Sequence, residues 1–151
     1  MTRKNILLIG VLLLLTAFCV YLYRDRFLPE PIQIGHRSVE PRGWLRRREK
    51  NSEADAIVFL LNQEIKLTSV KVVSLDELAT NKNAAPLWEL VSESNSIPVK
   101  DFIYGLNIRG MRPVRKGASA QPLEAGAHYR LYLKSGWHKL QHDFSPLPRK
   151  S

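Results

Sequence analysis

The chain has 151 residues, 44% of them hydrophobic, and its 23 basic residues outnumber the 14 acidic ones, for a formal net charge of +9. This length leaves room for one domain of ordinary size. A single cysteine excludes both a disulfide framework and a zinc site built from cysteine pairs, and the sequence has no glycine-rich phosphate loop, so no cofactor is expected.

A continuous apolar run from Ile6 to Tyr23 contains no charge and no proline. As a helix it would be about 27 Å long, close to the thickness of a hydrocarbon core at about 30 Å. Bulky aromatic and cationic residues follow it, where a signal peptidase would need small ones, and Phe18 precedes Cys19, which is not a lipoprotein pattern. We therefore expect residues 1–26 to form an uncleaved, single-pass signal-anchor with flanking charges.

The orientation of this anchor is ambiguous from charge. Two basic residues precede the run, and four follow it within about 20 residues, namely Arg24, Arg26, Arg37 and Arg42. Counted alone, they would keep the domain in the cytoplasm. Long segments translocate largely regardless of charge, however, and the absence of any cysteine after Cys19 suits an oxidising compartment. We expect an extracytoplasmic domain, with a cytoplasm-facing domain as the alternative.

Residues 27–50 are expected to form a proline-containing, basic juxtamembrane linker. Pro29 and Pro31 stiffen its beginning, because each fixes its own φ and biases the preceding residue toward extended conformations. Its second half gathers basic residues around a tryptophan: Arg42, Trp44, Arg46, Arg47, Arg48 and Lys50. Near an anionic membrane each basic residue contributes about 1 kcal/mol. This cluster is a candidate for binding anionic lipid or polymer, and a solvated linker is the alternative.

From about Ile32 to Phe144 the chain reads as short strands separated by turns. The stretch IQIGHRSV could open the series, although we place the domain proper at residues 51–145 and a basic tail at 146–151. An apolar run from Ala56 to Leu61 is followed by a polar break at residues 62–64 and then by IKLTSVKVV, which alternates as a half-buried strand does.

The next stretch, LDELATNKNAAP, is expected to be a loop that could include one helical turn. Three further strand candidates are LWELVSES, FIYGLNI and HYRLYLK, and WHKLQHDF would return from the last through a turn at Ser135 and Gly136. Six or seven such strands without a helical period predict an all-β, antiparallel sandwich behind the membrane helix.

The stretch LEAGAHYRLYL, from Leu123 to Leu133, narrows this fold class. It resembles the fibronectin type III and immunoglobulin-like superfamily, in which a leucine, a turn and a tyrosine six positions later lead into an alternating strand. Leu123, Gly126 and Tyr129 match that pattern. The resemblance implies that Tyr129 is a corner tyrosine, with its ring in the core and its hydroxyl bonded to nearby backbone.

The early apolar strand lacks the tryptophan usual in that superfamily, and Trp88 or Trp137 could fill a similar volume. The resemblance implies a fold and no catalytic residues, because a shared fold does not carry a shared function.

One group of residues could carry chemistry. His138, His142 and Asp143 form an H-x-x-x-H-D pattern whose two histidines share a face, which could begin a metal site. No third ligand is evident, and exposed histidines on a terminal strand are the simpler interpretation. Ser135 with His138 and Asp143 has the composition of a hydrolytic triad, but no nucleophile motif surrounds the serine. We predict no metal site and no catalytic residues.

Charge is the more informative feature. A second basic cluster, Arg109, Arg112, Arg115 and Lys116, contains no acidic residue. Its alternative interpretation is a set of solubilising loops. Nucleic acid is not the expected partner, because the aromatic pattern of single-strand binders is missing. We expect a membrane-anchored, non-catalytic binding or assembly module whose basic surface meets a protein, an anionic lipid or an anionic polymer. A membrane-tethered hydrolase or metal-dependent enzyme using the region of His138, His142 and Asp143 is the alternative.

Overall fold

The computed structural model describes residues 3–27, 31–40, 54–92 and 96–149, with the side chains of residues 24–27 left out. The chain divides into two units, Met1–Pro31 and Ile32–Ser151. The first holds helix α1 (Arg3–Phe27), in which Arg3–Tyr23 is long and apolar enough to cross a membrane. Apolar side chains cover the helix on all sides, as expected of a helix that lies in lipid.

The second unit is built almost entirely from β-strands. In the described part of the chain these elements are β1 (Ile34–Val39), β2 (Ala56–Ile65), β3 (Ser69–Ser74), α3 (Leu75–Thr80), β4 (Trp88–Ser92), β5 (Val99–Ile103), β6 (Met111–Pro113), β7 (Tyr129–Ser135) and β8 (His138–Phe144). All strand pairs are antiparallel. The expected all-β class is therefore confirmed.

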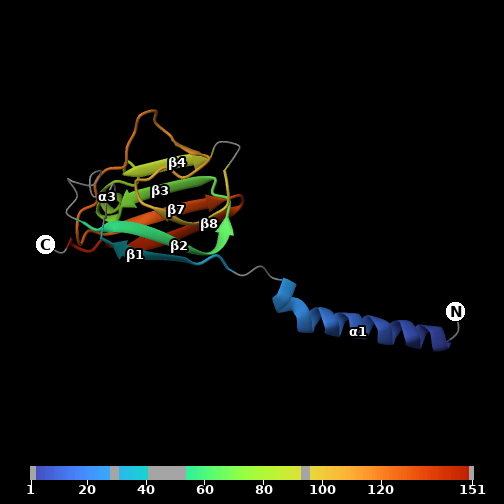
Figure 1. The fold of residues 1–151 in the computed structure, drawn as a ribbon. Coiled ribbons are helices and arrows are strands. Elements are labelled where there is room, and N and C mark those ends of the chain that lie inside the picture. The colour runs from blue at the N-terminus through green and yellow to red at the C-terminus, as the bar shows by residue number, and fades with distance from the viewer. Residues whose placement is uncertain (1–2, 28–30, 41–53, 93–95, 150–151) are drawn as a thin grey trace. The chain divides into compact units, whose positions relative to one another are not determined.

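The strands form two sheets that pack face to face (Figure 1). One sheet has the order β1-β2-β5 and the other the order β6-β4-β3-β7-β8. Their inner faces supply one hydrophobic core, in which Phe59 of β2 and Leu131 of β7 are 0% exposed. Phe59 meets Phe144 of β8 edge to face at 5.0 Å between ring centroids, which joins the two layers directly. Trp88 supplies the core tryptophan, while Trp137 is 99% exposed.

Three boundaries differ from the expected ones. β1 lies inside residues 27–50, the expected linker, yet pairs with β2 from Ile34 to Val39, so the domain begins before residue 51. β2 continues through the expected polar break at residues 62–64 to Ile65, because a strand tolerates polar side chains that point outward. The expected tail also contributes to the fold, since Pro146 is buried and Pro148 bridges Ala54.

The smaller elements agree with the expected ones in part. The stretch LDELAT forms a short helix, α3, whose first turn is capped by Ser74, the Oγ of which accepts the amide of Glu77 at 3.5 Å. The strand expected in FIYGLNI lies earlier, at Val99–Ile103. Strand β6 was not expected, because it is only three residues long and ends in Pro113.

Tyr129 begins β7 and is buried against the core, where its ring lies 5.7 Å from that of Phe144. Its hydroxyl oxygen accepts the amide N–H of Glu124 at 2.9 Å. Burial raises the pKa of Tyr129, because the phenolate would be poorly solvated there. Leu123 is also buried, and Gly126 has a φ of +78°, a conformation that favours glycine. The expected hydrogen bond between the hydroxyl of this tyrosine and nearby backbone is thus present.

Candidate anion-binding surface

The first basic cluster lies outside the described residues. That set comprises Arg42, Trp44, Arg46, Arg47, Arg48 and Lys50. The binding role expected of it therefore stays a prediction, and the candidate surface is built from the described domain alone.

Strand β6 and its flanking turns carry the second basic cluster. Arg112 lies on β6 opposite Val91 of β4, while Arg109 precedes the strand and Arg115 and Lys116 follow it. All four side chains are exposed. Because Met111 is buried and side chains alternate along a strand, Arg112 points away from the core. The structure thus places Arg112 on the outer face of the five-stranded sheet, with the other three in the turns at its edge.

The strand register extends this basic surface across the sheet. Ser69 of β3 pairs with both Val91 of β4 and Lys134 of β7, and Lys134 pairs with Lys139 of β8. Arg112, Lys134 and Lys139 therefore belong to one row that crosses all five strands. The strands lie about 4.8 Å apart, so the row spans about 19 Å. Lys71 stands in the next row on the same face, between Glu89 and Tyr132.

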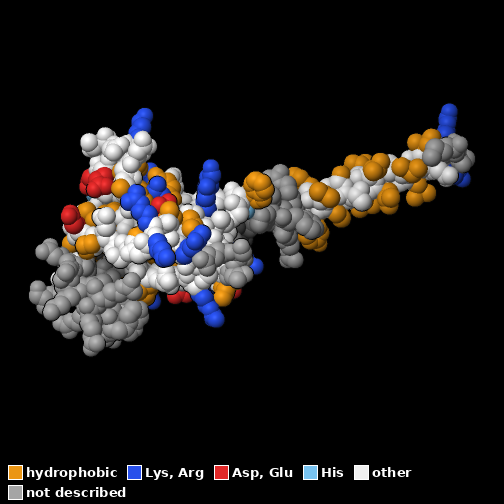
Figure 2. Space-filling model, turned by 90° about the horizontal axis from the view of Figure 1, so that it is seen from above, with side chains coloured by type: hydrophobic (Ala, Val, Ile, Leu, Met, Phe, Trp, Pro, Cys, Tyr) orange, Lys and Arg blue, Asp and Glu red, His pale blue; other side chains and the backbone are white. Residues whose placement is uncertain are grey.

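A shallow hollow lies between these two rows. It has a volume of about 240 Å³ and is lined by Ser69, Lys71, Glu89, Tyr132, Leu133, Lys134, Lys139 and Leu140. Among the residues that the structure describes, none forms an ion pair with its three lysines. Figure 2 shows basic side chains gathered on one face of the domain, with few acidic ones between them. We refer to Lys71, Arg112, Lys134 and Lys139 as the basic face.

A nearby arginine forms an ion pair that offsets its charge, so it does not add to the basic face. Arg130 of β7 donates to Asp143 of β8 through Nε at 2.5 Å and Nη2 at 2.7 Å, a bidentate pair. The hydrogen bonds from Arg130 hold the pKa of Asp143 below its usual range. Asp143 therefore stays ionised and engaged with Arg130 at neutral pH.

The candidate catalytic residues are not brought together into one site. His142 and Asp143 are neighbours on β8, so their side chains point to opposite faces of the sheet. The Nε2 of His142 lies 2.7 Å from the Nδ1 of His36 on β1, a hydrogen bond between the edges of the two sheets. His138 is exposed at the start of β8. Within the described residues, no group of three or more histidine, cysteine or acidic side chains could hold a metal ion.

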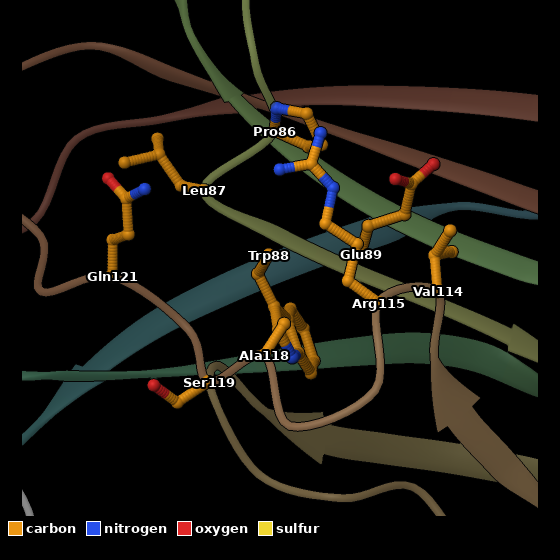
Figure 3. A pocket seen from close by; sticks show the side chains of 9 residues that line it. All are labelled: Pro86, Leu87, Trp88, Glu89, Val114, Arg115, Ala118, Ser119 and Gln121. Carbon is orange, nitrogen blue, oxygen red and sulfur yellow. The ribbon is translucent and has the colours of Figure 1, made fainter.

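A second hollow lies beside the start of β4 (Figure 3). Its volume is about 120 Å³, and it is lined by Pro86, Leu87, Trp88, Glu89, Val114, Arg115, Ala118, Ser119 and Gln121. Figure 3 shows Arg115 extending alongside Glu89, while the indole of Trp88 lies next to Ala118. The hollow is smaller than the 300 Å³ or so of ordinary ligand pockets. The lining residues thus offer one basic side chain at the edge of the sheet and no pairing of a nucleophile with a base.

Three functional candidates were missed by sequence reasoning: Lys71, Lys134 and Lys139. A signal for two of them was available, since Lys71 and Lys134 occupy outward positions in strands that alternate with buried Val72 and Leu133. Their proximity depends on β3 pairing with β7, which joins residues about 60 positions apart. The contact between His36 and His142 spans 106 positions and left no local signal.

Comparison with known proteins does not add a relative. No family model matches the chain, and no curated protein and no solved structure is significantly similar to it. Its function has to be argued from the chemistry of its own surface.

Proposed function

We propose that this chain is a membrane-anchored, non-catalytic binding module that holds an anionic partner on its basic face. The observation that carries the proposal is the set of three lysines, Lys71, Lys134 and Lys139, around one hollow without an ion pair to any described residue. Like charges repel one another, and Glu89 is the one acidic residue among those that line the hollow, so an anion bound there would offset the repulsion that remains among the three lysines. The 19 Å row suits an extended anionic partner better than a small ion.

The anchor in this proposal is α1, inserted as a single-pass helix with the domain outside the cytoplasm. The length and apolar character of Arg3–Tyr23 support insertion. Orientation is tested by fusing a reporter after Ser151 that is active only on one side of the membrane. Activity outside the cytoplasm is expected, and activity restricted to the cytoplasm would reverse the orientation and the set of available partners.

We further propose that the domain is an immunoglobulin-like or fibronectin type III-like sandwich. In the strand names of that superfamily, β1, β2 and β5 would correspond to A, B and E, and β3, β7 and β8 to C, F and G. The hydrogen bond between the Tyr129 hydroxyl and Glu124 supports the same assignment, because it has the form of a tyrosine corner.

Binding is tested with the full chain in nanodiscs of neutral lipid, which remove competition from anionic headgroups. The probe is fluorescently labelled polyglutamate, and labelled polylysine controls for non-specific adsorption. We expect binding of polyglutamate that weakens as salt rises, because exposed charges are screened over about 8 Å at physiological ionic strength. Polylysine should not bind.

The variant Lys71→Gln/Lys134→Gln/Lys139→Gln should lower the affinity about tenfold or more, because each exposed pair contributes up to about 1 kcal/mol. A matched control, Lys66→Gln/Lys82→Gln/Lys100→Gln, removes the same charge from exposed positions outside the basic face. Equal losses in the two triple variants would show that net charge, and not this face, attracts the probe. Absence of polyglutamate binding in the parent would overturn the proposal.

A further inference from the structure

Trp137 is the most exposed large apolar side chain in the described domain. It forms a two-residue turn with Gly136 between β7 and β8, and 99% of its surface is accessible to solvent. Gly136 has a φ of +57°, so the tight turn projects the next residue from the hairpin tip. A tryptophan is costly to leave in water, and its amphipathic ring is favoured where an apolar region meets a wet one.

The hairpin tip lies at the end of the domain where the chain arrives from α1. The amide of Gly136 donates to Thr68 Oγ1 at 3.2 Å, in the turn that follows β2. The last part of β2 also holds the start of β1, since the amide of Gln33 donates to Asn62 Oδ1 at 3.0 Å. Figure 1 shows the start of β1 and the β7–β8 turn at the same end of the sheets. We call residues 32–34, 62–69, 96–100 and 134–139 the tether end.

The covalent connection limits how far the tether end can lie from the membrane. α1 ends at Phe27 and β1 begins at Ile34, so six residues separate them. Even when fully extended, such a segment spans at most about 25 Å. A domain of this size has a radius of gyration of about 14 Å. Twice that radius is about 28 Å, so the chain length alone keeps the start of β1 within about one domain width of the end of α1.

The chemistry of the tether end matches a bilayer surface. Among its described residues the exposed large apolar side chains are Trp137 and Ile97, the latter 43% exposed. Its exposed basic side chains are Lys66, Lys100, Lys134 and Lys139, and the described carboxylate there is Glu64. Tryptophan is enriched at the headgroup level of membranes, and lysines near the surface are attracted by anionic lipids.

We infer that the tether end rests on the same membrane that holds α1, with Trp137 inserted among the headgroups and the surrounding lysines against anionic lipid. The inference shares the anchor with the proposed function but not its anionic partner. Lys134 and Lys139 belong to both the basic face and the tether end. Docking on an anionic membrane therefore places these two lysines against lipid and leaves Lys71 and Arg112 open to solvent, whereas in neutral lipid the whole basic face is available to a soluble polyanion.

The experiment uses the full chain with Trp44→Phe, so that Trp137 is the one surface tryptophan and Trp88 is a buried reference. The protein is placed in nanodiscs of phosphatidylcholine and phosphatidylglycerol, with or without bromine on the acyl chains. Brominated lipid should quench the emission contributed by Trp137, and adding Trp137→Phe should abolish this lipid-dependent loss. Equal Trp137 emission in both kinds of disc would overturn the inference and leave the hairpin tip available to a protein partner.

Three further variants, one of them a control, separate docking from chance encounters. Lys134→Gln/Lys139→Gln should reduce the quenching, whereas Lys82→Gln, which lies just beyond α3 near the other end of the domain, should not. Lengthening the segment 28–33 with a flexible glycine–serine insert should also reduce it, because a longer tether lowers the effective concentration at the membrane. Unchanged quenching in all three would contradict electrostatic docking. Polyglutamate binding without quenching would leave the proposed function standing and this inference refuted.

Discussion

The two ends of strand β7 carry two aromatic residues that differ in their exposure to solvent. Tyr129 at its start is 4% exposed and bonded to the backbone at Glu124, while Trp137 just beyond its end is 99% exposed. Both are amphipathic rings a few residues from a glycine with positive φ. At one end the aromatic side chain is buried and hydrogen-bonded within the domain. At the other end it is exposed to solvent. The contrast separates a residue that stabilises the domain from one that is free to bind.

Charge follows the same division. The tether end carries four exposed lysines and Glu64, whereas the opposite end carries Lys82 and the acidic side chains of Asp76, Glu77 and Glu124. An anionic surface would attract the first end and repel the second. Five substitutions, from the largest expected effect to the smallest, can break or sharpen this comparison.

The largest loss of stability is expected in the core between the two ends. Leu131→Ala removes a fully buried side chain from the middle of β7 and should lower the free energy of unfolding by about 2–5 kcal/mol. Urea unfolding of the full chain in detergent, followed through tryptophan fluorescence, measures the loss. Gln141→Ala on the outer face of β8 is the control and should stay within about 0.5 kcal/mol. Similar losses would mean that the two sheets do not share this core.

Tyr129→Phe tests the buried end of β7. It removes the oxygen that accepts the Glu124 amide and should cost about 1–3 kcal/mol, measured by the same unfolding experiment. Tyr132→Phe, on the outer face of the same strand, should cost less because water can replace its hydroxyl. A change within error for Tyr129→Phe would remove the best support for a tyrosine corner.

These residues also show how far sequence reasoning reaches. The apolar run of α1 and the alternation around Val70, Val72, Leu131 and Leu133 are local signals, and the structure confirms both elements. The extent of β2, the inclusion of β1 and the pairing of Pro148 with Ala54 depend on partners distant in the chain. The basic face is partly local, because outward positions on β7 can be read from the alternation. Its assembly from β3, β6, β7 and β8 requires the sheet order.

The contact between His36 and His142 links the two sheets near the middle of their edges and should respond to pH. Burial, and then the proximity of His36, lower the pKa of His142, while the nearby Asp143 carboxylate acts in the opposite direction. The folded state therefore favours the neutral ring, whereas the unfolded ring takes up a proton near pH 6.5. The stabilisation is complete above about pH 6.5 and is lost as the pH falls below it.

The temperature at the midpoint of thermal unfolding should thus decrease as the pH is lowered from about 7.5 to about 5.5. This range lies above the usual carboxylate pKa values. His142→Gln should flatten this dependence, and His138→Gln, at an exposed position four residues earlier, should leave it unchanged. If the pH dependence is unchanged in His142→Gln, another titrating group causes it.

Asp143→Asn tests the ion pair on the outer face of β7 and β8. Because both side chains are partly exposed, the loss should be only about 0.2–1 kcal/mol, despite the bidentate geometry. The effect should shrink at high salt, as measured by urea unfolding at two ionic strengths. A loss above about 2 kcal/mol would indicate that the pair is shielded from water.

The smallest effect is expected at the exposed aromatic. Trp137→Ser should change the free energy of unfolding by less than about 0.5 kcal/mol, because the side chain has almost no buried surface to lose. The free energy of unfolding of this variant is measured together with that of Tyr129→Phe, in detergent without lipid. A larger loss would mean that the hairpin tip stabilises the fold, and the contrast between the two ends of β7 would disappear.

The basic face is tested most directly by lysine acetylation of the full chain in neutral-lipid nanodiscs, with and without polyglutamate, read by mass spectrometry. Bound polyanion should protect Lys71, Lys134 and Lys139, which line one hollow of the five-stranded sheet. Lys82 beyond α3 should react equally in both samples. Uniform protection of all lysines, or protection of Lys82 without Lys71, would contradict a partner held on the basic face.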